Sequence, residues 1–207
     1  MNINYMSIGH DCSPAATLRN LNIRSEAMPF DWVVSNLQII KNCIEDKFKD
    51  YHKNLIFNST KTRLIDTYGF QFPHDYPFNQ NQIDSLKIGE GVFGEEPNKT
   101  IIENWNNYHS IALEKYTRRI ERLFNYLNSN DNLIILCRGY SSNDILILKN
   151  YLLNKFNKQN IYFVVASSEN YENKYIITCN PEINNNWNDS NIWLNAINKI
   201  KILNNLK

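Results

Sequence analysis

The strongest constraint on the fold comes from two apolar segments in the second half of the chain and the helix predicted between them. Residues 131–137 and 161–166 are largely apolar and have the length of buried strands. One of residues 141–143, a Ser-Ser-Asn run, can cap a helix that continues to about Phe156. A strand, a helix and a strand in this order favour a right-handed parallel crossover. We therefore predict an α/β fold in which residues 1–207 form a single domain, with a mostly parallel sheet flanked by helices.

A strand followed closely by a helix is also predicted at the start of the chain. Residues 3–8 resemble a short buried strand, and the glycine after them allows a tight turn. Pro14 suits the first turn of a helix that Asp11 or Ser13 can cap. Cys12 then lies near the positive end of the helix dipole, which favours a thiolate and is a typical place for a nucleophile. The alternative is that Cys12 is a small apolar residue packed under the turn.

The remaining elements follow from capping residues and helical spacing. They are a helix near 36–48 capped by Ser35, short strands near 54–57 and 63–67, a long helix from Thr100 to about Leu127 with a break near Asn106-Asn107, a strand over 175–179 and a helix that starts at Asp189 or Ser190. Otherwise residues 51–100 show no clear periodicity. So long an irregular stretch in a compact domain often carries function.

Charge and cysteine content narrow the class of protein. The 207 residues have a net charge of +1, so no global field favours nucleic acid or an acidic membrane as a partner. Without a signal peptide or a membrane-length apolar run, we expect a cytoplasmic location. The four cysteines form no C-x-x-C motif, which favours reduced thiols over a disulfide or zinc framework. We expect neither a metal nor a cofactor.

Several segments together resemble a known family. They are SIGHDC (7–12), Leu18-Arg19, Ile23-Arg24, PFDW (29–32), GFQFPHDY (69–76), KYTRRIERLF (115–124) and LIILCRG (133–139). The family is that of the "putative papain-like cysteine peptidases", a family of unknown function found in bacteria and large DNA viruses. The resemblance extends to about Val165. It implies a cysteine nucleophile at Cys12 and a histidine partner, for which His74 is the matching position.

The predicted architecture differs from that of papain itself. The Gly and Trp that accompany the papain cysteine are missing around Cys12. Cys12 instead follows a predicted strand, and Arg138 follows another. Open α/β sheets bind ligands at the carboxyl ends of their strands, so both residues are expected at one edge of the sheet. We prefer this arrangement, with a papain-like α+β fold as the alternative; Cys-His chemistry occurs on unrelated folds.

Two histidines are the best candidates for the catalytic base. His74 lies in the irregular segment and matches the family segment, and we predict that residues 68–78 fold over the sheet edge to deliver it to Cys12. His10 is the second candidate, or else a substrate-binding residue on the turn beside the thiol. We expect His52 and His109 to be surface or capping residues.

Asp31 is the best candidate for a third catalytic residue. It lies between two large aromatic residues that would bury it, and a buried carboxylate needs a partner. As a catalytic residue it would orient the imidazole and stabilise its protonated form. The alternative is that it accepts backbone hydrogen bonds in its own turn.

Basic residues provide candidates for substrate binding. Arg138 directly follows an apolar strand and precedes a glycine, where a guanidinium could receive a carboxylate or phosphate. Arg24 is a second candidate, with a surface ion pair as its alternative. Arg118, Arg119 and Arg122 lie on the long predicted helix and are expected to form a solvated face.

These residues support three hypotheses about function. The first is a cysteine hydrolase or acyltransferase acting on a peptide or other acyl substrate, with Cys12 as nucleophile, His74 as base and backbone amides of the first helix binding the oxyanion. The second is a non-catalytic module that binds an anionic small molecule or a sugar at the sheet edge. The third is an interaction protein in which these segments only build the fold.

Overall fold

The computed structural model describes residues 2–79, 83–94, 99–182 and 188–206. The chain folds as two compact units. Unit 1 combines Met1–Asp31 with Arg122–Lys207, and unit 2 is the intervening segment Trp32–Glu121.

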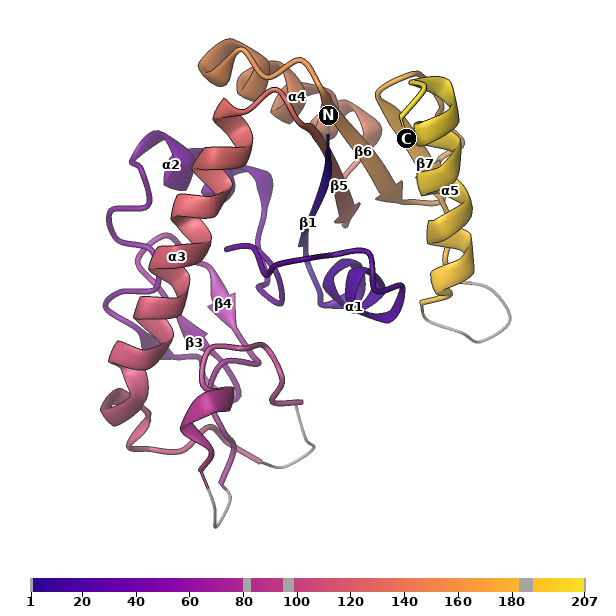
Figure 1. Cartoon of the computed structure of the whole chain (residues 1–207). Coiled ribbons are helices and arrows are strands. Elements are labelled where there is room, and N and C mark those ends of the chain that lie inside the picture. Colours follow the sequence, from indigo (N-terminus) through magenta and orange to yellow (C-terminus); the bar gives the residue numbers. More distant parts are fainter. Residues whose placement is uncertain (1, 80–82, 95–98, 183–187, 207) are drawn as a thin grey trace. The chain divides into compact units, whose positions relative to one another are not determined.

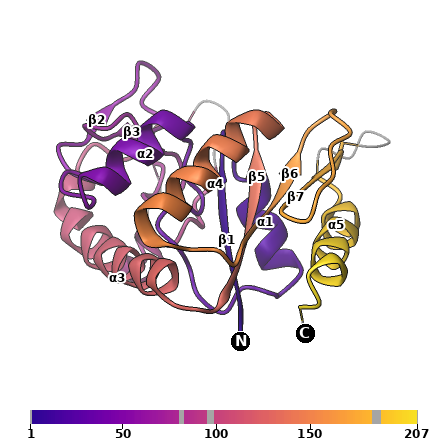
Figure 2. The same cartoon turned by 90° about the horizontal axis from the view of Figure 1, so that it is seen from above.

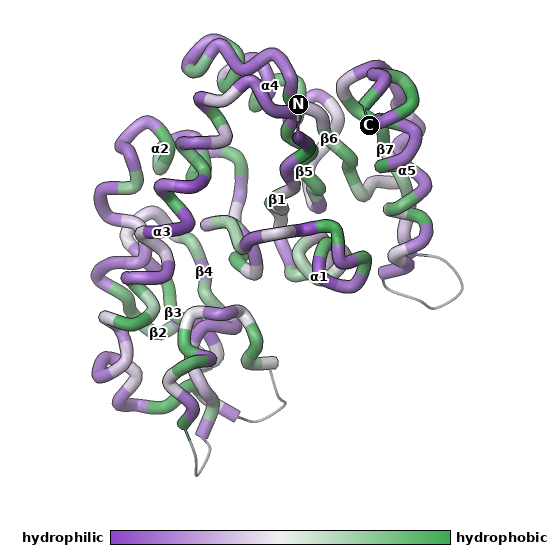
Figure 3. The backbone as a smooth tube through the Cα atoms, in the orientation of Figure 1, coloured by the Kyte–Doolittle hydropathy of each residue, from purple (hydrophilic) through white to green (hydrophobic). Residues whose placement is uncertain are grey.

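Unit 1 is built on a parallel sheet of four strands. These are β1 (Ile3–Gly9), β5 (Asn132–Arg138), β6 (Ile161–Ala166) and β7 (Ile176–Cys179), in the spatial order β1-β5-β6-β7 (Figure 1). Every neighbouring pair is parallel. Figure 3 shows the hydrophobic residues that run along β5 and β6. The predicted α/β fold with a mostly parallel sheet is therefore confirmed.

Helices cover both faces of this sheet (Figure 2). Helices α1 (Ser13–Asn20) and α5 (Ser190–Leu203) lie on one face, and α4 (Ser142–Phe156) lies on the other. Alternate strand residues point to alternate faces, and those directed at α1 and α5 form a buried cluster with them: Leu18, Ile134, Leu136, Tyr162, Val164, Ile177, Trp193, Ala196, Ile197 and Ile200.

This arrangement creates a topological switch point between β1 and β5. The chain leaves β1 into α1 on one face and leaves β5 into α4 on the opposite face. The connections therefore diverge at the carboxyl ends of these two neighbouring strands and open a crevice between them, which is where α/β sheets bind ligands.

Local capping agrees closely with the sequence in unit 1. Ser141 begins α4 with a capping box, in which its side chain accepts from the amide of Asp144 and the Asp144 side chain accepts from the amide of Ser141. Asp189 caps α5.

The described residues contain no helix that is both long and apolar enough to cross a membrane.

Unit 2 contains short elements joined by long irregular segments. They are α2 (Leu37–Glu45), β2 (Ile56–Phe57), β3 (Leu64–Ile65), β4 (Gln71–Phe72), the 3-10 helices η1 (Ser85–Lys87) and η2 (Trp105–Tyr108), and the first part of α3 (His109–Asn128), which continues into unit 1. The strands β2, β3 and β4 form a small antiparallel sheet.

Two helix starts in unit 2 differ from the predictions. Asn36, not Ser35, caps α2, and its side chain accepts a hydrogen bond from the amide of Ile39. The long helix begins at His109 rather than Thr100, because Ile101 is buried in an antiparallel bridge to Phe78. The burial of Ile101 is therefore due to an extended segment and not to a helix face.

The irregular segment is ordered around Asp66. Its carboxylate accepts hydrogen bonds from four backbone amides, those of His52, Tyr68, Gly69 and Phe70, at 3.0 Å each. Such a carboxylate satisfies backbone donors that no helix or sheet would satisfy. Asp66 therefore holds the turn between β3 and β4 through backbone amides.

His52 is fully buried in unit 2, which corrects the prediction of a surface or capping residue. Its ring packs against Phe72, Tyr76 and Tyr116. Its Nε2 lies 3.5 Å from Oδ2 of Asp75, which also accepts a hydrogen bond of 2.7 Å from the Tyr116 hydroxyl. Burial lowers the pKa of His52, although Asp75 acts in the opposite direction. The imidazole is therefore held in its neutral form.

Acid is expected to destabilise unit 2 through His52. Because its pKa is lowered in the folded state, the unfolded chain binds more protons below about pH 6.5, and stability falls by up to about 1.4 kcal/mol per pH unit as the pH drops. Urea unfolding at pH 7.5, 6.0 and 5.0 measures this slope. His52→Asn should flatten it, since asparagine does not titrate and tolerates the positive φ of 54° at this position. An unchanged slope in His52→Asn, with His109→Asn as control, contradicts the assignment.

Candidate functional site

The turn between β1 and α1 places Cys12 as predicted. Cys12 is the N-cap residue of α1, half-buried, and its carbonyl accepts the first helical hydrogen bond from Ala16 at 2.8 Å. Asp11 Oδ1 accepts a hydrogen bond of 2.8 Å from the Ser13 amide, so the predicted capping carboxylate is present one residue before the N-cap. The thiol thus lies at the positive end of α1, at the carboxyl end of β1.

Arg138, the last residue of β5, ties this turn to the neighbouring strand. Gly9 pairs with Arg138 across the sheet. The guanidinium reaches the residues on either side of Cys12: its Nε is 3.1 Å from Oδ2 of Asp11, and its Nη1 donates to the Ser13 hydroxyl at 3.2 Å. It also pairs with Glu182. Cys12 and Arg138 therefore share one edge of the sheet, as predicted.

Gly139 allows His10 to approach the end of β5. Its φ is +85°, and a Cβ at this position would lie 2.5 Å from Nδ1 of His10. Only glycine fits both the backbone conformation and the close contact. The His10 ring also packs edge-on against Tyr140, with 5.3 Å between ring centroids.

A cavity of about 430 Å³ opens at this edge of unit 1. Residues at the ends of all four strands line it. His10 and Asp11 follow β1, and residues 180–182 follow β7. Arg138 ends β5 and Gly139 follows it, and Ala166 ends β6 and residues 167–168 follow it. Its location agrees with the switch point between β1 and β5. Cys12 is the residue next to Asp11 in the chain.

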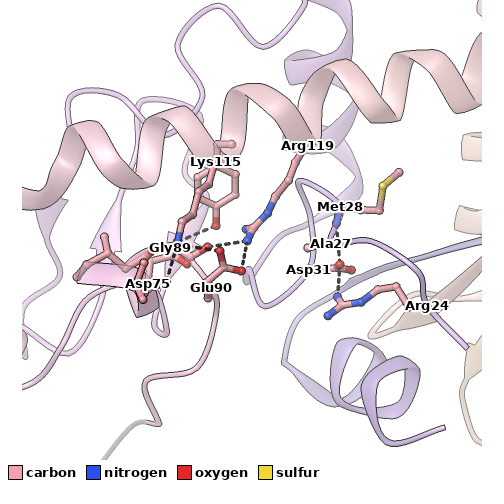
Figure 4. A network of polar contacts seen from close by, with 12 residues as sticks. Arg24, Ala27, Met28, Asp31, Asp75, Gly89, Glu90, Lys115 and Arg119 are labelled. Carbon is pink, nitrogen blue, oxygen red and sulfur yellow. Dashed lines mark hydrogen bonds and ion pairs between the residues drawn. The ribbon is translucent and has the colours of Figure 1, made fainter. Parts of the chain in front are cut away.

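Asp31 is completely buried in unit 1 and pairs with Arg24 (Figure 4). Its Oδ1 accepts from the Ser7 hydroxyl at 2.5 Å and from the Ser7 amide at 3.3 Å, and its Oδ2 accepts from the Met28 amide at 2.8 Å. These contacts connect β1 to the segment after α1. The carboxylate therefore acts as a structural acceptor, and its predicted role in orienting an imidazole stays a prediction.

His74 lies in unit 2, where a backbone carbonyl orients its ring. Its Nδ1 is 2.6 Å from the carbonyl oxygen of Phe93, and the ring packs edge-on against Trp32 at 5.9 Å between centroids. A carbonyl can only accept, so Nδ1 carries the proton and Nε2 is left as the basic nitrogen. Cys12 and His74 belong to different units, and their pairing stays a prediction.

The prediction that Arg119 lies on a solvated helix face is wrong. It is buried, donates to the Gly89 carbonyl at 2.7 Å and lies 3.2 Å from Glu90, which also pairs with Lys115 at 2.8 Å (Figure 4). Burial alone would raise the pKa of Asp75, but His52, Tyr116 and Arg119 outweigh it and lower that pKa.

Within the described ranges, His, Cys, Asp and Glu side chains form no group of three or more that could hold a metal ion.

Burial affects each of the other three thiols. Burial raises the pKa of Cys43 and of Cys137, and it raises the pKa of Cys179 to about 12. Acidic neighbours, Asp66 and Asp46, raise the pKa of Cys43 further. All three are therefore protonated and unreactive at neutral pH.

Comparison with models of known protein families shows which family the chain belongs to. A family model described as "Putative papain-like cysteine peptidase (DUF1796)" matches residues 3–165. The chain belongs to this family. The matched region starts at β1 and reaches β6, and it contains Cys12, Asp31 and His74.

A viral protein is related to this member of the family. "Uncharacterized protein R408" of Acanthamoeba polyphaga mimivirus is 27% identical over 150 residues, which correspond to 68% of this chain and 64% of that protein. The match therefore spans less than two thirds of that relative's length. No solved structure matches the chain.

Several residues of the site were not identified from the sequence of this family member. Ser13, Glu182 and Asn180 surround Arg138 or line the cavity, and Ser7 holds Asp31. Serine, asparagine and glutamate occur throughout the chain, so their types carry no signal. Their positions just after strands could have identified those at the sheet edge.

Proposed function

We propose that the chain is a cysteine-dependent hydrolase or acyltransferase in which Cys12 is the nucleophile. The observation that carries this proposal is the position of Cys12, at the N-terminus of α1 and the carboxyl edge of the sheet, one residue after Asp11, which lines a cavity. Helix N-termini favour thiolates, and thiolates attack acyl carbons. Membership of a family described as cysteine peptidases supports the same chemistry.

His74 is the proposed base. The Cys12 proton passes to Nε2 of His74, and the sulfur attacks the acyl carbon to form a C–S bond. The imidazolium then protonates the leaving amine or alkoxide as its bond to the acyl carbon breaks. Water or a second acceptor, deprotonated by the same nitrogen, then attacks the acyl carbon. The C–S bond breaks, and the imidazolium returns its proton to the Cys12 sulfur. The Phe93 carbonyl supplies the orienting acceptor that a carboxylate supplies in other cysteine and serine enzymes.

The first turn of α1 supplies the proposed oxyanion donor. Pro14 has no N–H, and the Ser13 amide donates to Asp11. We therefore propose that the oxyanion binds other backbone amides at the start of α1.

Alkylation of native protein tests the nucleophile. At pH 7, iodoacetamide should modify Cys12 well before Cys43, Cys137 and Cys179, whose thiols are protonated. The rate against pH should have its midpoint below about 8.5, the value of an ordinary cysteine. Peptide mapping locates the label, and Cys12→Ala should remove the fast phase. Labelling on the other three thiols, or at the rate of N-acetylcysteine, contradicts the proposal.

The cavity favours one alternative to catalysis, which is the binding of a small molecule. Its volume of about 430 Å³ lies in the range of small-ligand sites, so unit 1 could bind a small molecule without turning it over. In that case Cys12 would alkylate at an ordinary rate while ligands still bound to the cavity. Alkylation kinetics therefore separate the two functions.

A further inference from the structure

The cavity at the sheet edge carries more acidic than basic groups. Asp11 and Glu182 each contribute a carboxylate, and Arg138 contributes a guanidinium. With histidine counted as neutral, the formal charge of the lining is −1. Ser167, Ser168 and Asn180 add uncharged hydrogen-bonding groups without changing this balance.

The two carboxylates are more accessible than the guanidinium. The Arg138 side chain is 17% exposed, whereas those of Asp11 and Glu182 are 42% and 58% exposed. Arg138 also has intramolecular partners on both sides of Cys12 and in Glu182. Arg138 is paired with both carboxylates, so the cavity keeps one negative charge in excess. The more exposed side chains at its surface are the two carboxylates.

We propose that this cavity recognises a positively charged group, an ammonium or guanidinium, on the acyl substrate of Cys12. This inference rests on the proposed function and names its substrate class, a peptide or related acyl compound with a basic side chain near the reactive carbonyl. The carboxylates provide the charge, and the serine and asparagine side chains accept the remaining N–H donors. A substrate carboxylate or phosphate is disfavoured by the same charges.

Affinity labels with different side chains test the charge preference. We would use the chloromethyl ketones of N-acetyl arginine, norleucine and glutamate, in which the Cys12 thiolate displaces chloride and forms a C–S bond. The arginine reagent should inactivate Cys12 about fivefold faster than the norleucine reagent, the size expected for a partly exposed ion pair. The glutamate reagent should be the slowest of the three.

A charge-neutral variant of the cavity provides the decisive comparison. Glu182→Gln should reduce the arginine-to-norleucine rate ratio towards one, because it removes one carboxylate and keeps the side-chain shape. Glu172→Gln makes the same charge change where Glu172 pairs with Lys199, outside the cavity lining, and should keep the wild-type ratio. Equal rates for arginine and norleucine in wild type, or a preference for glutamate, overturn the inference.

The outcomes for substrate class and for catalysis are separable. Fast labelling of Cys12 by all three reagents without a charge preference supports the nucleophile and rejects the basic substrate. Slow labelling by all three, together with calorimetric binding of arginine amide that Glu182→Gln weakens, rejects the nucleophile and supports recognition of a cation by the cavity.

Discussion

Replacing Asp31 with alanine is expected to lower the free energy of unfolding by about 3–5 kcal/mol. The carboxylate is fully buried and contacts Arg24, Ser7 and the Met28 amide. Removing it leaves the Arg24 charge and three buried donors, the Ser7 hydroxyl and the Ser7 and Met28 amides, without their acceptor. Each unsatisfied donor adds to the cost. Urea or thermal unfolding of unit 1, followed by circular dichroism, measures the change.

A matched variant and a second readout separate the structural and catalytic roles of Asp31. Glu26→Ala removes a partly exposed carboxylate that pairs with Arg122 at 2.8 Å, and should cost less than about 1 kcal/mol. If Asp31→Ala folds with wild-type stability while Cys12 alkylation slows, the carboxylate orients the catalytic imidazole instead. If it unfolds as expected, Asp31→Asn at low temperature allows alkylation to be measured on folded protein.

Replacing His74 with alanine should slow turnover of an acyl substrate by about 10²–10⁴-fold, the usual contribution of a general base. Its Nδ1 is fixed by the Phe93 carbonyl, so Nε2 is the atom whose loss matters. Cys12 alkylation near neutral pH should slow as well, because no imidazole remains to take the thiol proton. The His74 side chain is only half-buried, so stability should change little.

The other histidines provide the controls for this prediction. His74→Gln keeps a donor for the Phe93 carbonyl but removes the base, and should behave like His74→Ala in alkylation. His10→Ala is the test of the second candidate, whose ring contacts Tyr140 and Gly139 at the sheet edge. If His10→Ala slows alkylation and His74→Ala does not, His10 is the base.

Local patterns predicted the sheet of unit 1 well. The apolar residues within 131–137 and 161–166 lie in β5 (Asn132–Arg138) and β6 (Ile161–Ala166). The carboxyl ends of parallel strands lie at one edge, so the positions of Cys12 and Arg138 followed from chain order alone. The N-caps of α2, α4 and α5 were predicted to within one residue, since neighbouring Ser and Asn residues are equally good caps. The start of α3 was not.

Contacts between distant residues account for what the sequence did not reveal. His52 is buried because Tyr116 and Asp75 reach it from other segments, and nothing near His52 in the chain indicates this. Asp66 orders the irregular segment through backbone amides, which have no residue type to recognise. Glu182, which follows β7, contacts Arg138 at the end of β5. Each of these requires the tertiary fold before its partner can be known.

The discontinuity of unit 1 has a consequence for how the chain is made. Ile3 of β1 pairs with Asn132 of β5, and all of unit 2 lies between them in the chain. At ordinary rates of protein synthesis, β1 therefore waits on the order of ten seconds for its neighbour to leave the ribosome. During that time the apolar strand and the Cys12 turn are exposed while unit 2 can already fold. The long wait therefore exposes β1 to wrong partners during synthesis, and it exposes the Cys12 thiol to oxidants before the sheet around it has formed.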